Sequence, residues 1–150
     1  MIANLALSRE ENTIILFNKI THGQELAKII NEKTERPVYF VYGDVDLKTR
    51  DEIKKALESE NNAIAVVSYG TFSTGISIKN IHHAILAVGY KSKVRVLQTI
   101  GRGLRLHPDK QVFNMYDLVD DLNYSMKHFL VRFKYYTKKH FKYTIKNISV

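Results

Sequence analysis

The segment 98–105, QTIGRGLR, carries the residues best suited to chemistry. Arg102 and Arg105 are three positions apart, so on a helix both guanidinium groups would project from one face. Gly101 and Gly103 would give a partner room to approach, although each costs about 1 kcal/mol inside a helix. Because arginine is a planar, permanently charged fork that suits phosphate, the segment predicts a phosphate site. Surface arginines at a frayed helix end are the alternative.

The second candidate is the segment 68–80, SYGTFSTGISIKN, which follows an apolar run typical of a buried strand. Its hydroxyl side chains and two glycines would lie at the carboxyl end of a parallel strand, where α/β sheets bind ligands. We therefore expect a ligand-binding loop, with a plain polar loop as the alternative. The stretch GTFSTGIS has the spacing of a P-loop, but Ile76 replaces the lysine that neutralises phosphates, which excludes that loop.

The residues that could ligate a metal are better explained otherwise, and we expect no metal site. His82 and His83 are neighbours, so on a strand they would point to opposite faces. Asp117, Asp120 and Asp121 could hold a metal, but helix capping explains them better. The chain has no cysteine. A disulfide framework and a thiolate site are therefore excluded, and a reducing cytoplasm is compatible.

The elements that must position these segments alternate between short apolar runs and helical patterns. We expect strands at 13–18, 37–42, 63–67, 83–88 and 112–119. We expect helices from a capping box at Thr21 and Gln24, and over 46–57, 92–104 and 122–141. Strands that alternate with helices predict an α/β domain with a mainly parallel sheet, covered on both faces.

Charge is concentrated at the end of the chain. The formal net charge is +8, and no acidic residue follows Asp121, so seven of the eight excess charges lie beyond it. Such a segment favours a polyanion such as nucleic acid or an anionic membrane surface, with a solvated helix face as the alternative. The expected helix would dock through Phe129, Leu130 and Phe133. No apolar run approaches the roughly 18 residues of a membrane span, and we expect no membrane partner.

Together these segments resemble the superfamily 2 helicases, and most of all those of T4-type phages. QTIGRGLR resembles their motif VI, Q-x-x-G-R-x-x-R; SYGTFSTGISI resembles motif V; and TIILFNKITHG resembles motifs IV and IVa. Their order and spacing agree over residues 12–121. The resemblance implies a RecA-like three-layer domain, the C-terminal lobe of such an enzyme, over residues 1–121. Residues 122–150 would then be a basic helical extension packed on the same domain.

The resemblance also implies roles at a nucleotide. Arg105 would be the arginine finger that reaches the γ-phosphate of ATP, and Arg102 its companion on the phosphates. Gln98 and Gly101 would shape the nucleotide edge of the cleft. Two further residues belong to this set: Gly75, which would couple the two ligands, and Ser77, which stands where many members carry an acidic residue that meets the ribose.

DNA is the second ligand that the resemblance implies. The residues assigned to it, by the resemblance or by charge, are Ser68, Thr71, Thr21, His22, Lys134, Lys138 and Lys142. The hydroxyls would meet phosphates, and a helix that starts at Thr21 would offer backbone N–H groups to another phosphate.

The 150 residues hold neither a P-loop nor the acidic segment that binds Mg²⁺ in this superfamily. We therefore expect the N-terminal RecA-like lobe of the same enzyme to supply both, with ATP and Mg²⁺ bound between the lobes. The expected function is a DNA helicase or translocase in recombination, repair or fork remodelling, in the cytoplasm of a phage-infected bacterium. The alternatives are a non-catalytic nucleic-acid-binding module with a degenerate helicase fold and the motor lobe of a restriction enzyme.

Overall fold

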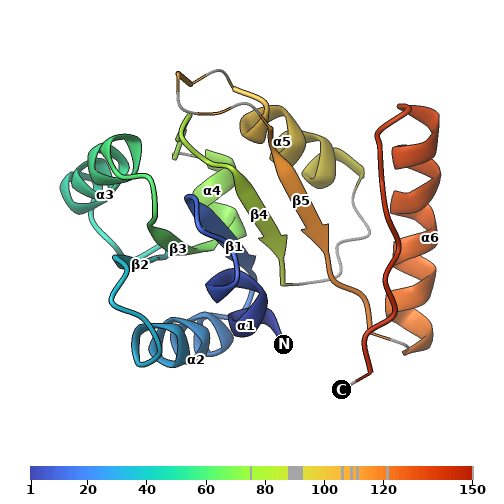
Figure 1. The fold of residues 1–150 in the computed structure, drawn as a ribbon, viewed down its shortest axis with the longest axis horizontal. Coiled ribbons are helices and arrows are strands. Elements are labelled where there is room, and N and C mark those ends of the chain that lie inside the picture. The colour runs from blue at the N-terminus through green and yellow to red at the C-terminus, as the bar shows by residue number, and fades with distance from the viewer. Residues whose placement is uncertain are drawn as a thin grey trace.

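The structure is a computed structural model that describes residues 1–74, 76–87, 93–105, 107, 108, 110, 112–120 and 122–149, with the backbone alone at 93–97. Its centre is a five-stranded parallel sheet in the order β2-β3-β1-β4-β5 (Figure 1). The strands are β1 Thr13–Phe17, β2 Val38–Val41, β3 Ile64–Ser68, β4 His83–Leu86 and β5 Asn114–Asp117. The predicted strands and their parallel arrangement are therefore confirmed.

Helices cover both faces of this sheet, as expected of a three-layer α/β domain. They are α1 Ile2–Leu7, α2 Ile20–Asn31, α3 Leu47–Ser59, α4 Tyr69–Thr74, α5 Lys93–Gly103 and α6 Asn123–Lys138. One apolar cluster joins α1 and α2 to the sheet, and another joins α3 and α4 to the opposite face. α5 packs against α4, and α6 stands beyond β5 at the edge of the domain (Figure 1). α1 is not among the helices that the sequence pattern predicts.

Strand β1 shows why the core forms on both faces. All five of its residues are buried, with Ile14 and Leu16 in one apolar cluster and Ile15 and Phe17 in the other. Gly23 of α2 lies directly over the Phe17 ring, so that any side chain at position 23 would overlap it. Glycine at this position therefore allows α2 to approach the sheet closely.

The amino ends of three strands are joined by one buried amide. The Asn12 Nδ2 donates to the carbonyls of Leu57 and Asn80, both at 2.8 Å, and to that of Glu60. Its Oδ1 accepts from the Ala63 N–H at 2.8 Å. A buried amide is stabilising only when its hydrogen bonds are made, and here both ends are satisfied. Asn12 therefore fixes β1 relative to β3 and β4.

His82 and His83 have separate structural partners, as neighbours along an extended chain should. The His82 Nε2 lies 3.1 Å from the Asn80 Oδ1, and the His83 Nε2 lies 2.8 Å from the Glu11 Oε2. Burial lowers the pKa of His82, while the bond from His83 lowers the pKa of Glu11. Within the described ranges no three His, Cys, Asp or Glu side chains form a group that could hold a metal ion.

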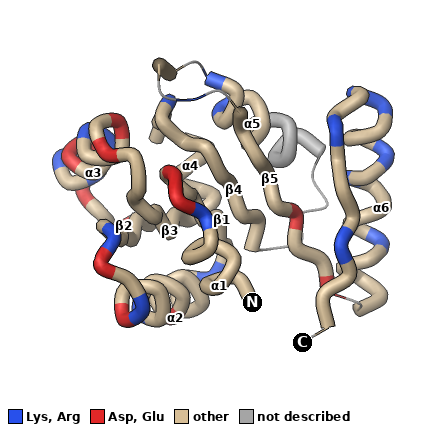
Figure 2. Tube along the Cα trace, in the orientation of Figure 1, with Lys and Arg blue, Asp and Glu red and all other residues tan. Residues whose placement is uncertain are grey.

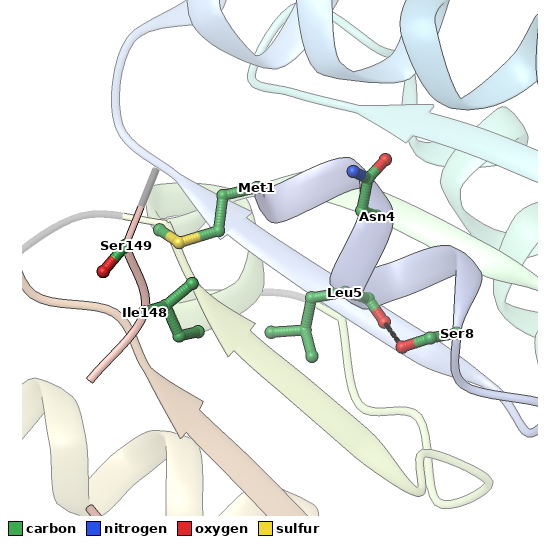
Figure 3. Close-up of a pocket in the computed structure, with 6 residues that line it drawn as sticks. All are labelled: Met1, Asn4, Leu5, Ser8, Ile148 and Ser149. Carbon is green, nitrogen blue, oxygen red and sulfur yellow. Dashed lines mark hydrogen bonds between the residues drawn. The ribbon is translucent and has the colours of Figure 1, made fainter. Parts of the chain in front are cut away.

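Residues 139–149, which we call the tail, follow α6 and run back beside it (Figure 1). The Tyr143 ring meets the Phe133 ring edge-on, with centroids 5.0 Å apart. Near its end the tail reaches α1, where a shallow groove lies between the two segments (Figure 3). The groove is lined by Met1, Asn4, Leu5, Ser8, Ile148 and Ser149. The two ends of the chain thus lie close together.

Candidate functional site

The segment that follows β3 is half helix, so the expectation of a loop over 68–80 is wrong for its first part. Ser68 ends β3 and begins the turn into α4, because its hydroxyl accepts the Thr71 N–H at 3.3 Å. A serine at this position replaces a hydrogen bond that the helix start otherwise lacks. The Ser68 and Thr71 hydroxyls also lie 2.7 Å apart, and Thr71 is only 4% exposed. Of the two, only Ser68 lies partly exposed to a ligand.

Two further hydroxyls of this segment, those of Ser73 and Thr74, point to the backbone of their own helix. The Ser73 and Thr74 hydroxyls both donate to the Gly70 carbonyl, at 2.9 and 2.8 Å. Beyond α4 the chain is held by Ile76, Ile78 and Ile81, which are all buried. Ser77 lies half-buried between two of these anchors. Gly75, the expected coupling residue, lies outside the described residues.

Arg102 of α5 joins the two candidate segments. Its guanidinium donates to the Ile76 carbonyl at 3.0 Å and to the Ser73 carbonyl at 2.8 Å. The same group lies 5.4 Å from the centre of the Phe72 ring. These contacts tie the motif VI-like helix to the last turn of α4 and to the chain just beyond it. They use two of the five N–H donors of arginine.

Arg105 does not share a helical face with Arg102, so that expectation is wrong. α5 ends at Gly103, and the Arg105 N–H bonds to the Arg102 carbonyl in the turn that follows. At this last helical position the Phe113 ring occupies the space where a side chain at 103 would lie, so only glycine fits there. The Arg105 side chain is exposed, and it has no ion-pair partner among the residues that the structure describes.

Gln98 and Gly101 lie on the exposed side of α5. The Gln98 Oε1 accepts from the Tyr69 hydroxyl at 2.9 Å, which is a second link between α4 and α5. A side chain at Gly101 would meet nothing within 4 Å. Of the two glycines, then, only Gly101 leaves space for an outside partner, whereas the space beside Gly103 holds Phe113.

The start of α2 differs from the predicted capping box. The helix begins at Ile20, with Lys19 as an extended N-cap residue and no side-chain cap. Thr21 therefore lies inside the first turn, and with His22 it precedes Gly23, whose N–H bonds to the Lys19 carbonyl. The close contact between Gly23 and Phe17 fixes where α2 crosses the sheet. A local sequence pattern carries no information about such a contact. Thr21 is exposed and His22 half-buried at this helix end.

Asp117 is an ion-pair partner, so its expected role as a helix cap is wrong. It ends β5 and accepts from the Arg132 Nε at 2.7 Å, from the Arg132 Nη2 at 2.8 Å and from the Tyr136 hydroxyl at 2.8 Å. Burial, reinforced by the Asp117 charge, raises the pKa of Tyr136. Asp120 bonds locally to the Leu122 N–H, and Asp121 lies outside the described residues.

This ion pair also changes which face of α6 is buried. Arg132, one of the basic residues beyond Asp121, is 1% exposed, while Leu130 of the expected apolar stripe is 52% exposed. Phe129 and Phe133 are half-buried, with ring centres 5.6 Å apart. Tyr136 packs against Ile100 of α5. α6 therefore rests on β5 and α5 through a mixed polar and apolar face.

The basic residues predicted to meet DNA are on the outer side. Lys134 and Lys138 are exposed on α6, which ends at Lys138 and so stops three residues before the end of the expected helix, and Lys142 is exposed in the tail. In Figure 2 the blue Lys and Arg positions are spread along α6 and along the tail beside it. Across the described part of the chain, no helix is long and apolar enough to span a membrane.

Comparison with known proteins gives one family and several related structures. Residues 1–107 match the family described as helicase conserved C-terminal domain. The ATP-dependent DNA helicase uvsW of Enterobacteria phage T4 is 39% identical over 168 aligned residues, which cover 99% of this chain and 33% of that protein. This chain thus spans about a third of that relative's length.

Solved structures agree with this assignment. The crystal structure of T4 UvsW superposes with a TM-score of 0.81 over 98% of this chain and 33% of that chain, at 39% identity. The C-terminal domain of the DEAD-box protein Dbp5 superposes with a TM-score of 0.70 over 91% of this chain and 77% of that one, at 17% identity. The latter likeness concerns the fold alone. The predicted RecA-like fold and the likeness to phage helicases are confirmed.

Proposed function

The chain belongs to the helicase conserved C-terminal domain family of superfamily 2, and from this premise we propose that it is the C-terminal motor lobe of an ATP-dependent DNA helicase or translocase. This enzyme would act in DNA recombination, repair or replication-fork remodelling. A second RecA-like lobe would supply the P-loop and the Mg²⁺ ligands. The curated relative is itself described as an ATP-dependent DNA helicase, and the chain corresponds to a third of it.

The observation that carries the proposal is the bridge made by Arg102. Its two bonds to the carbonyls of Ser73 and Ile76 hold the motif V-like segment against the motif VI-like helix. A motor must convert a change at the nucleotide into a change at the nucleic acid, so the segments that meet the two ligands have to move together. A direct guanidinium bridge between them is suited to that role.

Arg105 is the proposed arginine finger. It follows the end of α5, is exposed, and lacks an ion-pair partner in the described ranges. Its guanidinium is therefore available to bind a phosphate. ATP would supply the free energy for translocation. Arg102 is first a positioning residue, with its remaining donors available to the phosphates, while Gln98, Gly101, Gly75 and Ser77 would border the nucleotide.

On the nucleic-acid side, the partly exposed Ser68 is the strongest of the proposed contacts. Thr71 would act through it, since the two hydroxyls are bonded. The first turn of α2, with Thr21 and His22, would offer backbone N–H groups to a phosphate. Lys134, Lys138 and Lys142 would add charge along the path of the DNA.

A chimera tests the proposal directly. The 150 residues replace the matching third of the phage T4 helicase, a substitution that 39% identity across nearly the whole chain makes feasible. We expect ATP hydrolysis by the chimera that DNA stimulates. A second chimera with Arg102→Ala should keep ATP binding but lose stimulation by DNA, because the bridge is gone. A folded chimera without DNA-stimulated hydrolysis would contradict the proposed function.

A further inference from the structure

The exposed side chains of residues 122–148 form a surface that the motor motifs do not use, and we call it the α6–tail surface. Lys127, Lys134 and Lys138 are spaced seven and four residues apart, which places them on one face of α6. All three are exposed, and Lys142 and Lys146 are exposed along the neighbouring tail. Residues 122–149 contain no Asp or Glu (Figure 2). The surface therefore attracts a polyanion.

Large apolar side chains are exposed on the same two segments, α6 and the tail, as these lysines. Tyr124 is 79% exposed and Leu130 52% exposed on α6, and Val131 is exposed beside them. On the tail, Tyr143 and Ile145 are also exposed. A purely electrostatic site for a duplex has no use for such side chains, because a duplex hides the faces of its bases. A single strand presents those faces, which stack on aromatic and apolar groups.

The α6–tail surface is held in place before any ligand arrives. On the opposite side of the same helix, Arg132 and Tyr136 bond to Asp117 of β5, and Tyr136 packs on Ile100. The Tyr143 ring holds the tail against Phe133. A ligand thus meets a preformed surface and does not have to order it.

The length of the lysine row suits a short stretch of one strand. Along an α-helix, Lys127 and Lys138 are separated by about 16 Å, at 1.5 Å per residue. A stacked strand advances about 3.4 Å per nucleotide, so the row spans about five nucleotides.

From these observations we propose that the α6–tail surface binds single-stranded nucleic acid in preference to duplex, with phosphates on the lysines and base faces on Tyr124 and Leu130. The inference rests on the proposed DNA motor function and names the form of DNA that this surface holds. An acidic protein with an apolar centre is the other class of partner that such a surface could meet, and the test separates the two.

The experiment measures binding of the full 150-residue chain to an oligothymidylate of about 20 nucleotides and to a duplex of equal length, by fluorescence anisotropy. The test variant is Tyr124→Ser with Leu130→Ser, two exposed positions whose change should leave the melting temperature unaltered. We expect oligothymidylate binding to weaken at least about fivefold, the loss typical of one stacked base. Duplex binding should stay within twofold.

Two control variants complete the design. Leu47→Ser alters an apolar side chain on α3 that is 80% exposed and far from α6, and it should change neither affinity. Lys134→Gln with Lys138→Gln should weaken both ligands, because both present phosphates. Unchanged oligothymidylate binding by the Tyr124 and Leu130 variant, or an equal loss for duplex, would overturn the inference. If the lysine variant also changes nothing, nucleic acid does not bind at the α6–tail surface, which likewise overturns the inference.

The two proposals fail separately. Tyr124 and Leu130 lie outside the motif-like segments, so the chimera with the phage helicase reports on the motor function without them. DNA-stimulated hydrolysis by that chimera, combined with equal oligothymidylate binding by wild type and variant, would overturn the single-strand inference alone.

Discussion

The Arg132 guanidinium donates twice to the Asp117 carboxylate, from Nε to Oδ2 at 2.7 Å and from Nη2 to Oδ1 at 2.8 Å. The Tyr136 hydroxyl adds a third bond at 2.8 Å. Asp117 ends β5, whereas both donors belong to α6, so the pair is the joint between the sheet and the last helix.

Breaking this joint should destabilise the domain strongly. Arg132→Ala leaves the Asp117 carboxylate buried with one partner, and loss of one member of a buried pair costs about 3–5 kcal/mol. Denaturant unfolding followed by circular dichroism measures the change. Tyr136→Phe is the milder control, at about 1.5–3 kcal/mol for a hydrogen bond to a charged group. A loss below about 1 kcal/mol for Arg132→Ala would show that the pair does not hold α6.

The 150-residue polypeptide should not hydrolyse ATP at a measurable rate, with or without DNA. Its nearest approach to a P-loop carries Ile76 where the phosphate-binding lysine is required. Phosphoryl transfer depends on that ammonium and on Mg²⁺ to stabilise the charge of the transition state. An assay of phosphate release measures the rate. DNA-stimulated ATP hydrolysis by the purified chain would contradict the proposal that a second lobe is required.

Arg105 should be required for turnover in the active chimera. Arg105→Ala should lower the rate of ATP hydrolysis by a factor of about 10³–10⁵, the usual contribution of an arginine finger. Arg105→Lys should also fail, because a flexible ammonium does not reproduce the planar fork. The exposed Lys28→Ala on α2 serves as the control. Hydrolysis near the parent rate in either Arg105 variant would make this arginine an ordinary surface residue.

The basic residues of α6 and the tail should contribute to DNA binding through phosphate alone. Replacing Lys134, Lys138 and Lys142 by glutamine should weaken binding to every duplex sequence alike. The slope of log K against log salt should shrink by about 0.9 for each phosphate that a lysine no longer neutralises. A salt titration measures this, with Lys28→Gln and Lys33→Gln as a matched pair near α2. Identical slopes for the wild type and the triple variant would show that these lysines do not contact DNA phosphates and only keep the helix solvated.

The stability of the chain should fall as the solution is acidified below about pH 6.5. Burial lowers the pKa of His82, with Glu11 opposing the shift and His83, Lys110 and His107 adding to it. The unfolded chain therefore takes up a proton at a higher pH than the folded chain does, so the free energy of unfolding decreases through that range. His82→Gln keeps a donor for Asn80 and removes the titration. The melting temperature of the variant should then change less between about pH 7 and pH 5 than that of the wild type. Equal changes in melting temperature for the two proteins would contradict this.

The sheet and its main helices could be predicted from sequence because their signals are local. Apolar runs such as 13–17 and 64–67 mark buried strands, and the periodicity of 47–59 marks a helix. α1 was missed because it has only six residues, too few for a periodic pattern. The family likeness was confirmed since its motifs extend along most of the chain.

The candidate site was less predictable because it depends on contacts between distant segments. From the sequence alone, Arg132 belongs to the basic surface of the last helix. Only the fold shows that it is paired with Asp117, fifteen residues earlier. In the same way, a local pattern does not show that Phe113 packs against Gly103, or that α5 ends at Gly103, before it reaches Arg105. The type of a residue limits the roles that it can take, and its contacts in the fold determine which of these roles it has.

The groove between α1 and the tail places Met1 and Ile148 on its two sides. A domain whose two ends meet can be cut elsewhere and rejoined there without disturbing its strand order. A circular permutant that links residue 149 to residue 1 through a few glycines and opens at the exposed Asn61 should thus fold with the same sheet.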